Sequence, residues 1–380
     1  MKEKKKSYLS FKESREIVKY NKQQIRYYEK LKKRKHIPES EYVVTMRDEN
    51  NAVEFDDLHT FFFTDTGTVK AVDGVSFDIP SHSTVGVVGE SGCGKSVTSL
   101  SLLRLVQAPQ GQIVSGSIRY KAKNGKCYDI TKLPQSKMED ISGKEISMIF
   151  QEPMTSLNPV FTIGYQLDEV TLLHVEGATK ELAKQKSLEM LELVGIANKE
   201  RVYKSYPHEL SGGMRQRVMI AMALCCQPNL IIADEPTTAL DVTIQAQILD
   251  LLRDLKNKFD SSIMLITHDL GVIAEMADFV VVMYAGKVVE TGSVFEIFDN
   301  PSHPYTISLL KSKPVVGRKV DELYCIKGRV PSAVNLPDYC YFRDRCEQAC
   351  EACGGKYPEF VQLTPTHKVA CHLYKKPEKE

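Results

Sequence analysis

One stretch constrains the fold of this chain more than any other: Gly89-Glu90-Ser91-Gly92-Cys93-Gly94-Lys95-Ser96. It fits the phosphate-binding pattern G-x-x-x-x-G-K-[ST] at every fixed position. Its glycines let the backbone curl until successive N–H groups face a single anion. Residues 84–88 before it predict a buried strand, and residues 96–106 predict a helix whose N-terminus carries partial positive charge. The sequence therefore predicts a strand, a phosphate loop and a helix in that order.

The residues of this loop have separate expected tasks. Lys95 is expected to reach the β- and γ-phosphates of a nucleotide, and the Ser96 hydroxyl to bind its magnesium ion. A chance match in a glycine-rich turn is the alternative, and the strand and helix predicted on either side argue against it. The predicted nucleotide-binding residues are Gly89, Glu90, Ser91, Gly92, Cys93, Gly94, Lys95, Ser96 and Val97.

Length and composition fit a globular protein of two or three units. The chain has 380 residues, of which 42% are hydrophobic, enough for a sizeable core. Its longest unbroken apolar run, Val218 to Cys226, has nine residues, whereas a membrane-spanning helix needs about 20. The basic N-terminus has no apolar segment of a secretory signal. We therefore expect a cytosolic protein that does not itself cross the membrane.

The charge is unevenly distributed, although the formal net charge is only +1. Residues 1–36 contain 14 Lys or Arg and 4 Asp or Glu, an excess of +10 (14 minus 4). Ile17, Tyr20, Tyr27 and Leu31 are spaced loosely as one helical face. This basic N-terminal arm, residues 1–44, can lie on anionic lipid, contact nucleic acid, or be solvated and disordered.

Short runs of β-forming residues begin at Ala52 and predict a small antiparallel sheet ahead of the strand at residues 84–88. They cover residues 53–55, 59–63, 69–72 and 75–79. Phe61, Phe62 and Phe63 precede the phosphate loop by 26 to 28 residues, where an aromatic ring can stack on adenine. If side chains alternate strictly between core and solvent along this strand, two of the three phenylalanines are core residues. We assign the stacking role to Phe62.

A second helix start with features of an anion site lies further along the chain. Between residues 155 and 194 the apolar spacing changes to three and four, which predicts a helical insertion. Ser211 then stands at an N-cap position, and Gly212 and Gly213 after it expose backbone N–H groups. A single nucleotide cannot obviously occupy both this helix start and the phosphate loop.

Two carboxylates follow a wholly apolar strand of the buried parallel type, residues 230–233. Open α/β sheets bind ligands at the carboxyl ends of such strands. Asp234 is suited to magnesium, and Glu235 to orienting and deprotonating the attacking water. A further strand, residues 262–267, brings His268 to the same sheet edge, where it is suited to sensing the γ-phosphate.

Together these motifs resemble those of the ATP-binding subunits of ABC transporters, over roughly residues 52–315. The resemblance implies an α/β fold of the P-loop type, with a RecA-like parallel sheet core, an antiparallel β subdomain and an α-helical signature subdomain at about residues 155–225. Met214 stands where glutamine is commoner, and this change spares the serine and glycine contacts. The matching motifs are Walker A (Gly89 to Ser96), the Q-loop (Gln151), the signature (Leu210 to Met214), Walker B (Leu230 to Asp234, with Glu235), the D-loop (Ala239 to Asp241) and the switch histidine (His268).

The resemblance also implies roles and a dimer. Two cassettes dock head to tail, so that each ATP lies between the Walker A of one subunit and the signature of the other. Ser211, Gly212, Gly213 and Asp241 would then contact the partner's nucleotide. The implied catalytic residues are Glu235, His268, Gln151 and Lys95, and the implied magnesium ligands are Ser96, Gln151 and Asp234.

Three segments, residues 150–159, 234–243 and 303–306, are similar to those of oligopeptide, dipeptide and nickel importers. This similarity implies an ATPase on the cytoplasmic face of the membrane, working with a second, different ATPase subunit, two transmembrane permease subunits and an extracytoplasmic binding protein. No nucleic acid is expected. The alternatives are a nickel importer and a soluble ABC ATPase acting on nucleic acid or ribosomes. The latter usually carries a long coiled coil or a second cassette, which this sequence lacks.

After about residue 315 the chain loses periodicity and gathers cysteine, which predicts a small Cys-rich module at residues 316–380. Six of the ten cysteines lie here. Cys340, Cys346, Cys353 and Cys371 provide four thiolates for a tetrahedral metal or cluster site. The spacing is similar to that of peptide-importer ATPases, which implies a 4Fe-4S cluster. There are three alternatives. The Cys350-x2-Cys353 spacing also suits zinc, the thiols can be free, or the segment can be a redox sensor that gates the ATPase.

Overall fold

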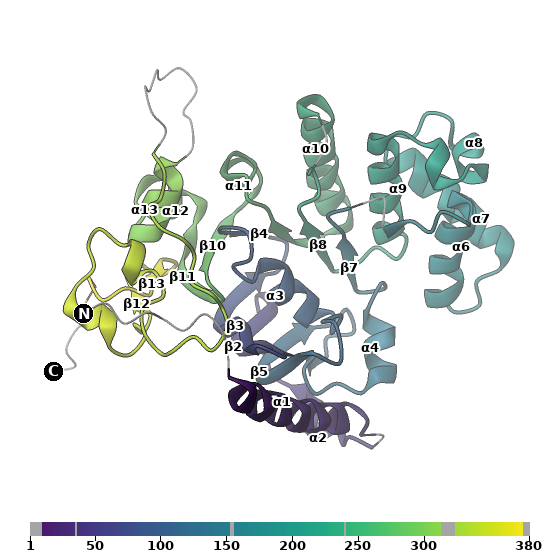
Figure 1. Ribbon diagram of the computed structural model, residues 1–380. Helices are drawn as coiled ribbons and strands as arrows, with labels where there is room; N and C mark the ends of the chain where they lie inside the picture. The colour runs from purple at the N-terminus through teal and green to yellow at the C-terminus, as the bar shows by residue number, and fades with distance from the viewer. Residues whose placement is uncertain (1–9, 35, 153–155, 239–240, 313–323, 375–380) are drawn as a thin grey trace.

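Two sheets organise the computed structural model, which describes residues 10–34, 36–152, 156–238, 241–312 and 324–374 (Figure 1). The larger sheet has eight strands in the order β12-β13-β11-β10-β4-β9-β8-β7. Five neighbouring strands are parallel: β10 (Phe279–Tyr284), β4 (Thr84–Val88), β9 (Ser262–Ile266), β8 (Leu230–Asp234) and β7 (Ile146–Ile149). All residues of β4, β8 and β9 are buried, as expected for parallel strands covered on both faces.

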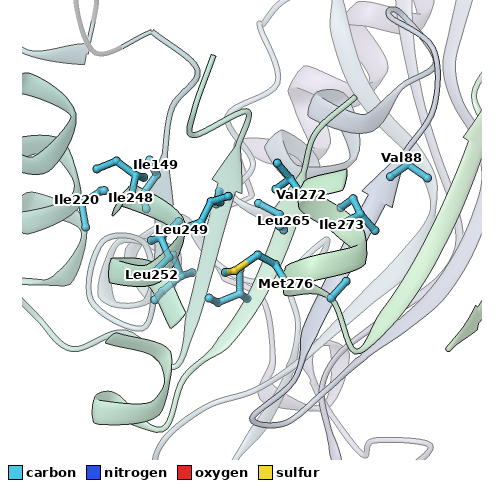
Figure 2. Packing of buried hydrophobic residues seen from close by; sticks show 14 of the residues in the cluster. Val88, Ile149, Ile220, Ile248, Leu249, Leu252, Leu265, Val272, Ile273 and Met276 are labelled. Carbon is cyan, nitrogen blue, oxygen red and sulfur yellow. The ribbon is translucent and has the colours of Figure 1, made fainter. Parts of the chain in front are cut away.

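Helices cover one face of this sheet. Alternating side chains of the buried strands point to opposite faces, so Leu265 faces the helices and its neighbours Met264 and Ile266 face away. Figure 2 shows Leu265 between side chains of α10 (Val242–Phe259) and α11 (Leu270–Met276). From these two helices the figure labels Ile248, Leu249 and Leu252 of α10 and Val272, Ile273 and Met276 of α11.

The second sheet is antiparallel and packs on the other face of the core. Its five strands follow the order β1-β6-β5-β2-β3. The four predicted β-runs merge into two long strands that form one hairpin, with register shifts both between the first two runs and inside the second, after Thr60. The bounds are β1 (Val43–Val44), β2 (Asn51–Thr64), β3 (Gly67–Pro80), β5 (Gly111–Lys121) and β6 (Cys127–Asp129), with α3 (Lys95–Leu102) and α4 (Gln135–Ile141) beside them.

The basic N-terminal segment forms helix α1 (Phe11–Lys32), followed by α2 (Glu39–Tyr42). Helix α1 packs on the antiparallel sheet: Asn21 Nδ2 donates to the Thr64 carbonyl oxygen at 2.6 Å, and Tyr28 stacks on Phe63. Tyr20 and Tyr27 of the expected apolar face are more than half exposed, so the helix packs on the sheet through other residues. A disordered segment is ruled out for residues 11–32.

A cluster of helices extends from the β7 edge of the large sheet (Figure 1). It confirms the predicted helical insertion, and the N-cap side chains of Thr162, Thr179, Asn198 and Ser211 start its helices. In the part of the chain that is described, no helix is both long and apolar enough to cross a membrane. The bounds are α6 (Ile163–His174), α7 (Lys180–Leu193), α8 (Lys199–Lys204), the 3₁₀ helix η1 (Pro207–Glu209) and α9 (Gly212–Leu224).

The C-terminal segment, residues 324–374, is built into the large sheet and its core. Strands β13 (Lys368–Val369) and β12 (Val361–Gln362) continue the large sheet beyond β11 (Lys287–Ser293). Phe342, beside the 3₁₀ helix η2 (Arg343–Arg345), packs against both Tyr284 of β10 and Tyr305 of α13 (Pro304–Lys311). A separate Cys-rich module is thus not supported, because Leu336, Tyr341 and Phe342 of this segment share one core with the sheet. Helix α12 (Val294–Asp299) and η3 (Glu351–Gly354) complete the described elements.

Candidate nucleotide-binding and hydrolysis site

Four parallel strands deliver the predicted site residues to one edge of the large sheet. Strand β9 lies between β4 and β8, so that Ile266 is level with both Val87 and Asp234. Strand β7 ends beside β8 in the same direction. The residues that follow these strands therefore converge: the phosphate loop (residues 89–96), Gln151, Glu235 and His268.

The phosphate loop requires glycine at two positions because other backbone lies against it. A Cβ at Gly89 would be 2.1 Å from the Met283 carbonyl oxygen, and one at Gly94 would be 2.3 Å from that of Ala71. Both glycines also have positive φ, 153° and 102°. Strands β10 and β3 thus hold the loop in shape from two sides, as the pattern of glycines predicts.

Lys95 and Ser96 lie at the start of α3, as predicted. Lys95 is 6% exposed, and its Nζ donates to the carbonyl oxygens of Gly89 (2.8 Å) and Glu90 (3.2 Å). This ammonium group is therefore held across the loop where a phosphate would lie. Ser96 Oγ donates to Asp234 Oδ1 at 3.1 Å.

Asp234 and Ser96 form a pair of oxygen groups suited to magnesium. Burial raises the pKa of Asp234 and the charge of Glu235 adds to this, while the Ser96 hydrogen bond opposes it. A divalent cation would favour the carboxylate form and be bound by oxygen ligands, which magnesium prefers. The donor set thus fits the ion. Gln151, the third predicted ligand, instead contacts Glu235 here, and its metal role stays a prediction.

Glu235 is the centre of the hydrogen bonds at this edge. Its Oε2 accepts from Gln151 Nε2 (3.0 Å) and Thr238 Oγ1 (2.9 Å), and its Oε1 lies 3.3 Å from His268 Nδ1. Its backbone has a positive φ of 46°, uncommon for this residue type, and its N–H donates to the Ile266 carbonyl oxygen. The structure therefore brings together three of the four predicted catalytic residues, Glu235, Gln151 and His268, and the role of Glu235 as a general base stays a prediction.

Phe62 lies on β2 opposite Val69, close in the hairpin to the Ala71 carbonyl that contacts the phosphate loop. Phe63 alone of the three phenylalanines is buried, and Phe61 and Phe62 are partly exposed. The expectation of two core residues is wrong, because a register shift between Thr60 and Phe61 breaks the alternation. Adenine stacking by Phe62 stays a prediction.

The signature residues lie away from the phosphate loop of their own chain. Ser211 caps α9, which groups with α6 to α8 beyond β7, whereas α3 and the phosphate loop follow β4 (Figure 1). A Cβ at Gly212 would meet no atom within 4 Å, so this helix start is open. Asp241 caps α10 and accepts from the Ile244 N–H. The D-loop residues Ala239 and Leu240 are outside the described residues.

Three further residues contribute to the site, although none of them is predicted from the sequence to act there. Thr238 binds Glu235, and Tyr305 Oη accepts from the Glu90 N–H at 2.9 Å. Arg345, in the C-terminal segment, forms a two-pronged ion pair with Glu90. These hydrogen bonds to Glu90 raise the pKa of Arg345, which stays charged. Thr238 and Tyr305 lie in segments that are similar to those of importers, whereas Arg345 has no such signal.

The cysteines of the C-terminal segment gather but are not arranged as metal ligands. Cys350 and Cys353 have sulfur atoms 3.6 Å apart. Burial raises the pKa of Cys340 to about 12 and that of Cys371 to about 11, so these thiols are neutral at physiological pH. Among the described residues, no group of three or more His, Cys, Asp or Glu is placed to hold a metal ion. The predicted cluster or zinc site is thus not supported.

Fold and site together define a P-loop ATPase with an inserted helical subdomain and an ABC-type signature. Two family descriptions match the chain: "ABC transporter" over residues 72–238 and "Oligopeptide/dipeptide transporter, C-terminal region" over residues 289–353. The chain belongs to the ABC transporter family, among the ATP-binding proteins of oligopeptide and dipeptide transporters. The resemblance found in the sequence is therefore confirmed, and the protein is an ATPase.

Similar proteins match along most of their length. The oligopeptide transport ATP-binding protein AppD of Bacillus subtilis is 52% identical over 85% of this chain and 96% of its own length. The dipeptide transport ATP-binding protein DppD of the same organism is 49% identical over 83% and 92%. Among solved structures, the dimeric ATP-binding cassette MJ0796 in a post-hydrolysis state with ADP and Pi has a TM-score of 0.56 and 26% identity, covering 64% of this chain and 98% of that one.

Proposed function

We propose that this chain binds and hydrolyses ATP to power an importer of oligopeptides or dipeptides. The observation that carries the proposal is 52% identity with an oligopeptide transport ATP-binding protein over 96% of its length. The match of residues 289–353 to the C-terminal region of oligopeptide and dipeptide transporters supports the same substrate class. The relatives do not favour the nickel and nucleic-acid alternatives.

Hydrolysis follows from the geometry around Glu235. Magnesium, when bound with ATP at Ser96 and Asp234, supplies electrostatic stabilisation of charge on the phosphate oxygens. Lys95, held by two loop carbonyls, is placed to exchange these for phosphate oxygens. Glu235 takes the proton from the attacking water, and its bonds with Gln151 and His268 hold the carboxylate in position.

The dimer is part of the proposal. Ser211 and Gly212 are open to solvent and distant in the fold from the chain's own phosphate loop, so they are free to contact the nucleotide of a second ATPase subunit. Asp241 caps the helix that follows the D-loop and would join the same interface. We propose a different ATPase subunit as the partner, with closure driven by ATP and opening by hydrolysis.

The remaining partners are two transmembrane permease subunits and, through them, an extracytoplasmic substrate-binding protein. The family match supports permease partners, because the ATP-binding protein of a transporter acts together with subunits that cross the membrane. The location proposed is peripheral, on the cytoplasmic face of the membrane. The absence of a spanning helix among the described residues agrees with attachment through other subunits.

Reconstitution tests the proposal. The full chain, with its second ATPase subunit, permeases and binding protein in lipid vesicles, is expected to accumulate a labelled oligopeptide or dipeptide only when ATP is present at the face bearing this subunit. Labelled nickel is measured in parallel. Uptake of nickel and not of peptide, or peptide uptake without ATP, would contradict the proposal.

We also propose that Cys340, Cys346, Cys353 and Cys371 bind a 4Fe-4S cluster, with zinc as the alternative. Support comes from their spacing in the sequence, and from the Cys340 N–H, which donates to the Cys353 carbonyl oxygen at 3.3 Å and so places two of the four cysteines side by side. Protein purified anaerobically is expected to contain iron and to absorb visible light, and Cys340→Ser to lose both.

The control is Cys325→Ser, because Cys325 is exposed and outside the predicted set. It should retain iron and absorbance. Zinc without iron would overturn the cluster in favour of the alternative. Protein with neither metal would overturn both.

A further inference from the structure

The phosphate loop is contacted from outside the ATPase motifs by the C-terminal segment. Arg345 Nη1 and Nη2 bind the two carboxylate oxygens of Glu90 at 2.6 and 3.0 Å. This two-pronged geometry is the strongest form of such a pair. The Arg345 side chain is only 5% exposed and that of Glu90 27%, so the pair is largely shielded from solvent screening.

Arg345 is itself held rigidly. Its Nη1 donates to Tyr284 Oη at 3.2 Å and its Nε to the Lys327 carbonyl oxygen at 3.1 Å. The guanidinium also lies over the rings of Tyr284 and Phe342. A fixed arginine of this kind loses little entropy when it binds a carboxylate.

Glu90 stands inside the loop that receives the polyphosphate. Its carbonyl oxygen accepts from Lys95 Nζ, and its N–H donates to Tyr305 Oη. An unpaired carboxylate at this position would repel the phosphates and be free to compete for Lys95. Pairing with Arg345 neutralises the carboxylate and turns it toward the C-terminal segment.

We propose that Arg345 is a positioning residue for ATP binding, which sets the charge and orientation of Glu90 and so makes nucleotide affinity depend on the C-terminal segment. The effect is independent of which substrate is transported. Arg345 directly precedes Cys346 in the chain, so the pair with Glu90 also connects the nucleotide site to the cysteines of the C-terminal segment.

The test is a double-mutant cycle on the full chain, with binding of a fluorescent ATP analogue and the KM and kcat of hydrolysis as readouts. Arg345→Met is expected to raise the Kd and KM for ATP about tenfold with little change in kcat. Glu90→Gln combined with Arg345→Met is expected to return the Kd to within about twofold of the parent, because the uncompensated charge is gone.

Arg343→Met is the matched control. Arg343 lies two residues away on the same 3₁₀ helix, pairs with the adjacent Asp344 and lies over the Tyr339 ring. It should bind ATP like the parent. Thermal unfolding without nucleotide checks that Arg345→Met is folded, and Tyr341, which donates to Asp73 at 2.8 Å, anchors the segment independently.

Two outcomes would overturn the proposal. The first is an unchanged Kd in folded Arg345→Met. The second is a weakened Kd that Glu90→Gln does not restore, because this would show that Arg345 acts through packing alone.

Discussion

The Glu235→Gln variant is expected to bind ATP normally and to hydrolyse it about 10² to 10⁴ times more slowly, the usual contribution of a general base. Glutamine preserves the shape of the side chain and can still accept from Gln151 or Thr238. It cannot take a proton from water. Because ATP would persist, the variant should also accumulate as a closed dimer, measured by size-exclusion chromatography with and without ATP.

Glu275→Gln is the control for this experiment. Glu275 is an exposed glutamate that pairs with Arg253 on the surface, so both turnover and dimerisation should match the parent. Undiminished turnover in Glu235→Gln would remove Glu235 as the base. A loss of ATP binding would show instead that its role is structural.

The Lys95→Met variant is expected to lose both binding and hydrolysis. A hydrogen bond to a charged group contributes about 1.5–3 kcal/mol, which corresponds to roughly a 10- to 100-fold weaker affinity for ATP. Methionine also leaves the carbonyl oxygens of Gly89 and Glu90 without the donor that spans them. Fluorescent-nucleotide binding and phosphate release measure the two effects.

The control here is Lys258→Met, on the exposed side of α10. It should leave both readouts unchanged. The two site variants should differ in kind, because Glu235→Gln retains ATP and Lys95→Met does not. Wild-type affinity in Lys95→Met would contradict the role assigned to the lysine.

The sheet edge that carries Glu235 and His268 could be predicted because its signals lie close together in the sequence. Parallel strands that end in the same direction bring their following residues together, so buried runs before Glu235 and His268 were enough to predict their proximity. The glycines of the phosphate loop were equally informative, because only a residue without Cβ fits beside the Met283 and Ala71 carbonyls. Ser211 predicted the start of α9 because a serine side chain at this position can accept from a free backbone N–H of the first turn.

Prediction from the sequence failed where a local pattern was broken, and where the pattern fitted more than one arrangement. The alternation of β2 fails at the register shift after Thr60, which leaves Phe63 as the single core residue of its run. Helix α1 has apolar residues on more than one side, so only packing against the sheet decides that Asn21 is inside and Tyr20 outside. The C-terminal segment has too little periodicity to reveal strands of two residues each.

The sequence by itself determined the nucleotide loop, the position of the carboxylate proposed to activate water, the helical insertion and the family. Each of these depends on residues that are adjacent in the chain or separated by a helical or strand repeat. Only the tertiary structure decided that α1 covers the antiparallel sheet, that the C-terminal strands extend the core, and that Arg345 meets Glu90 across 255 positions. Such contacts join surfaces that come together only after the sheet has formed, and they follow no local spacing.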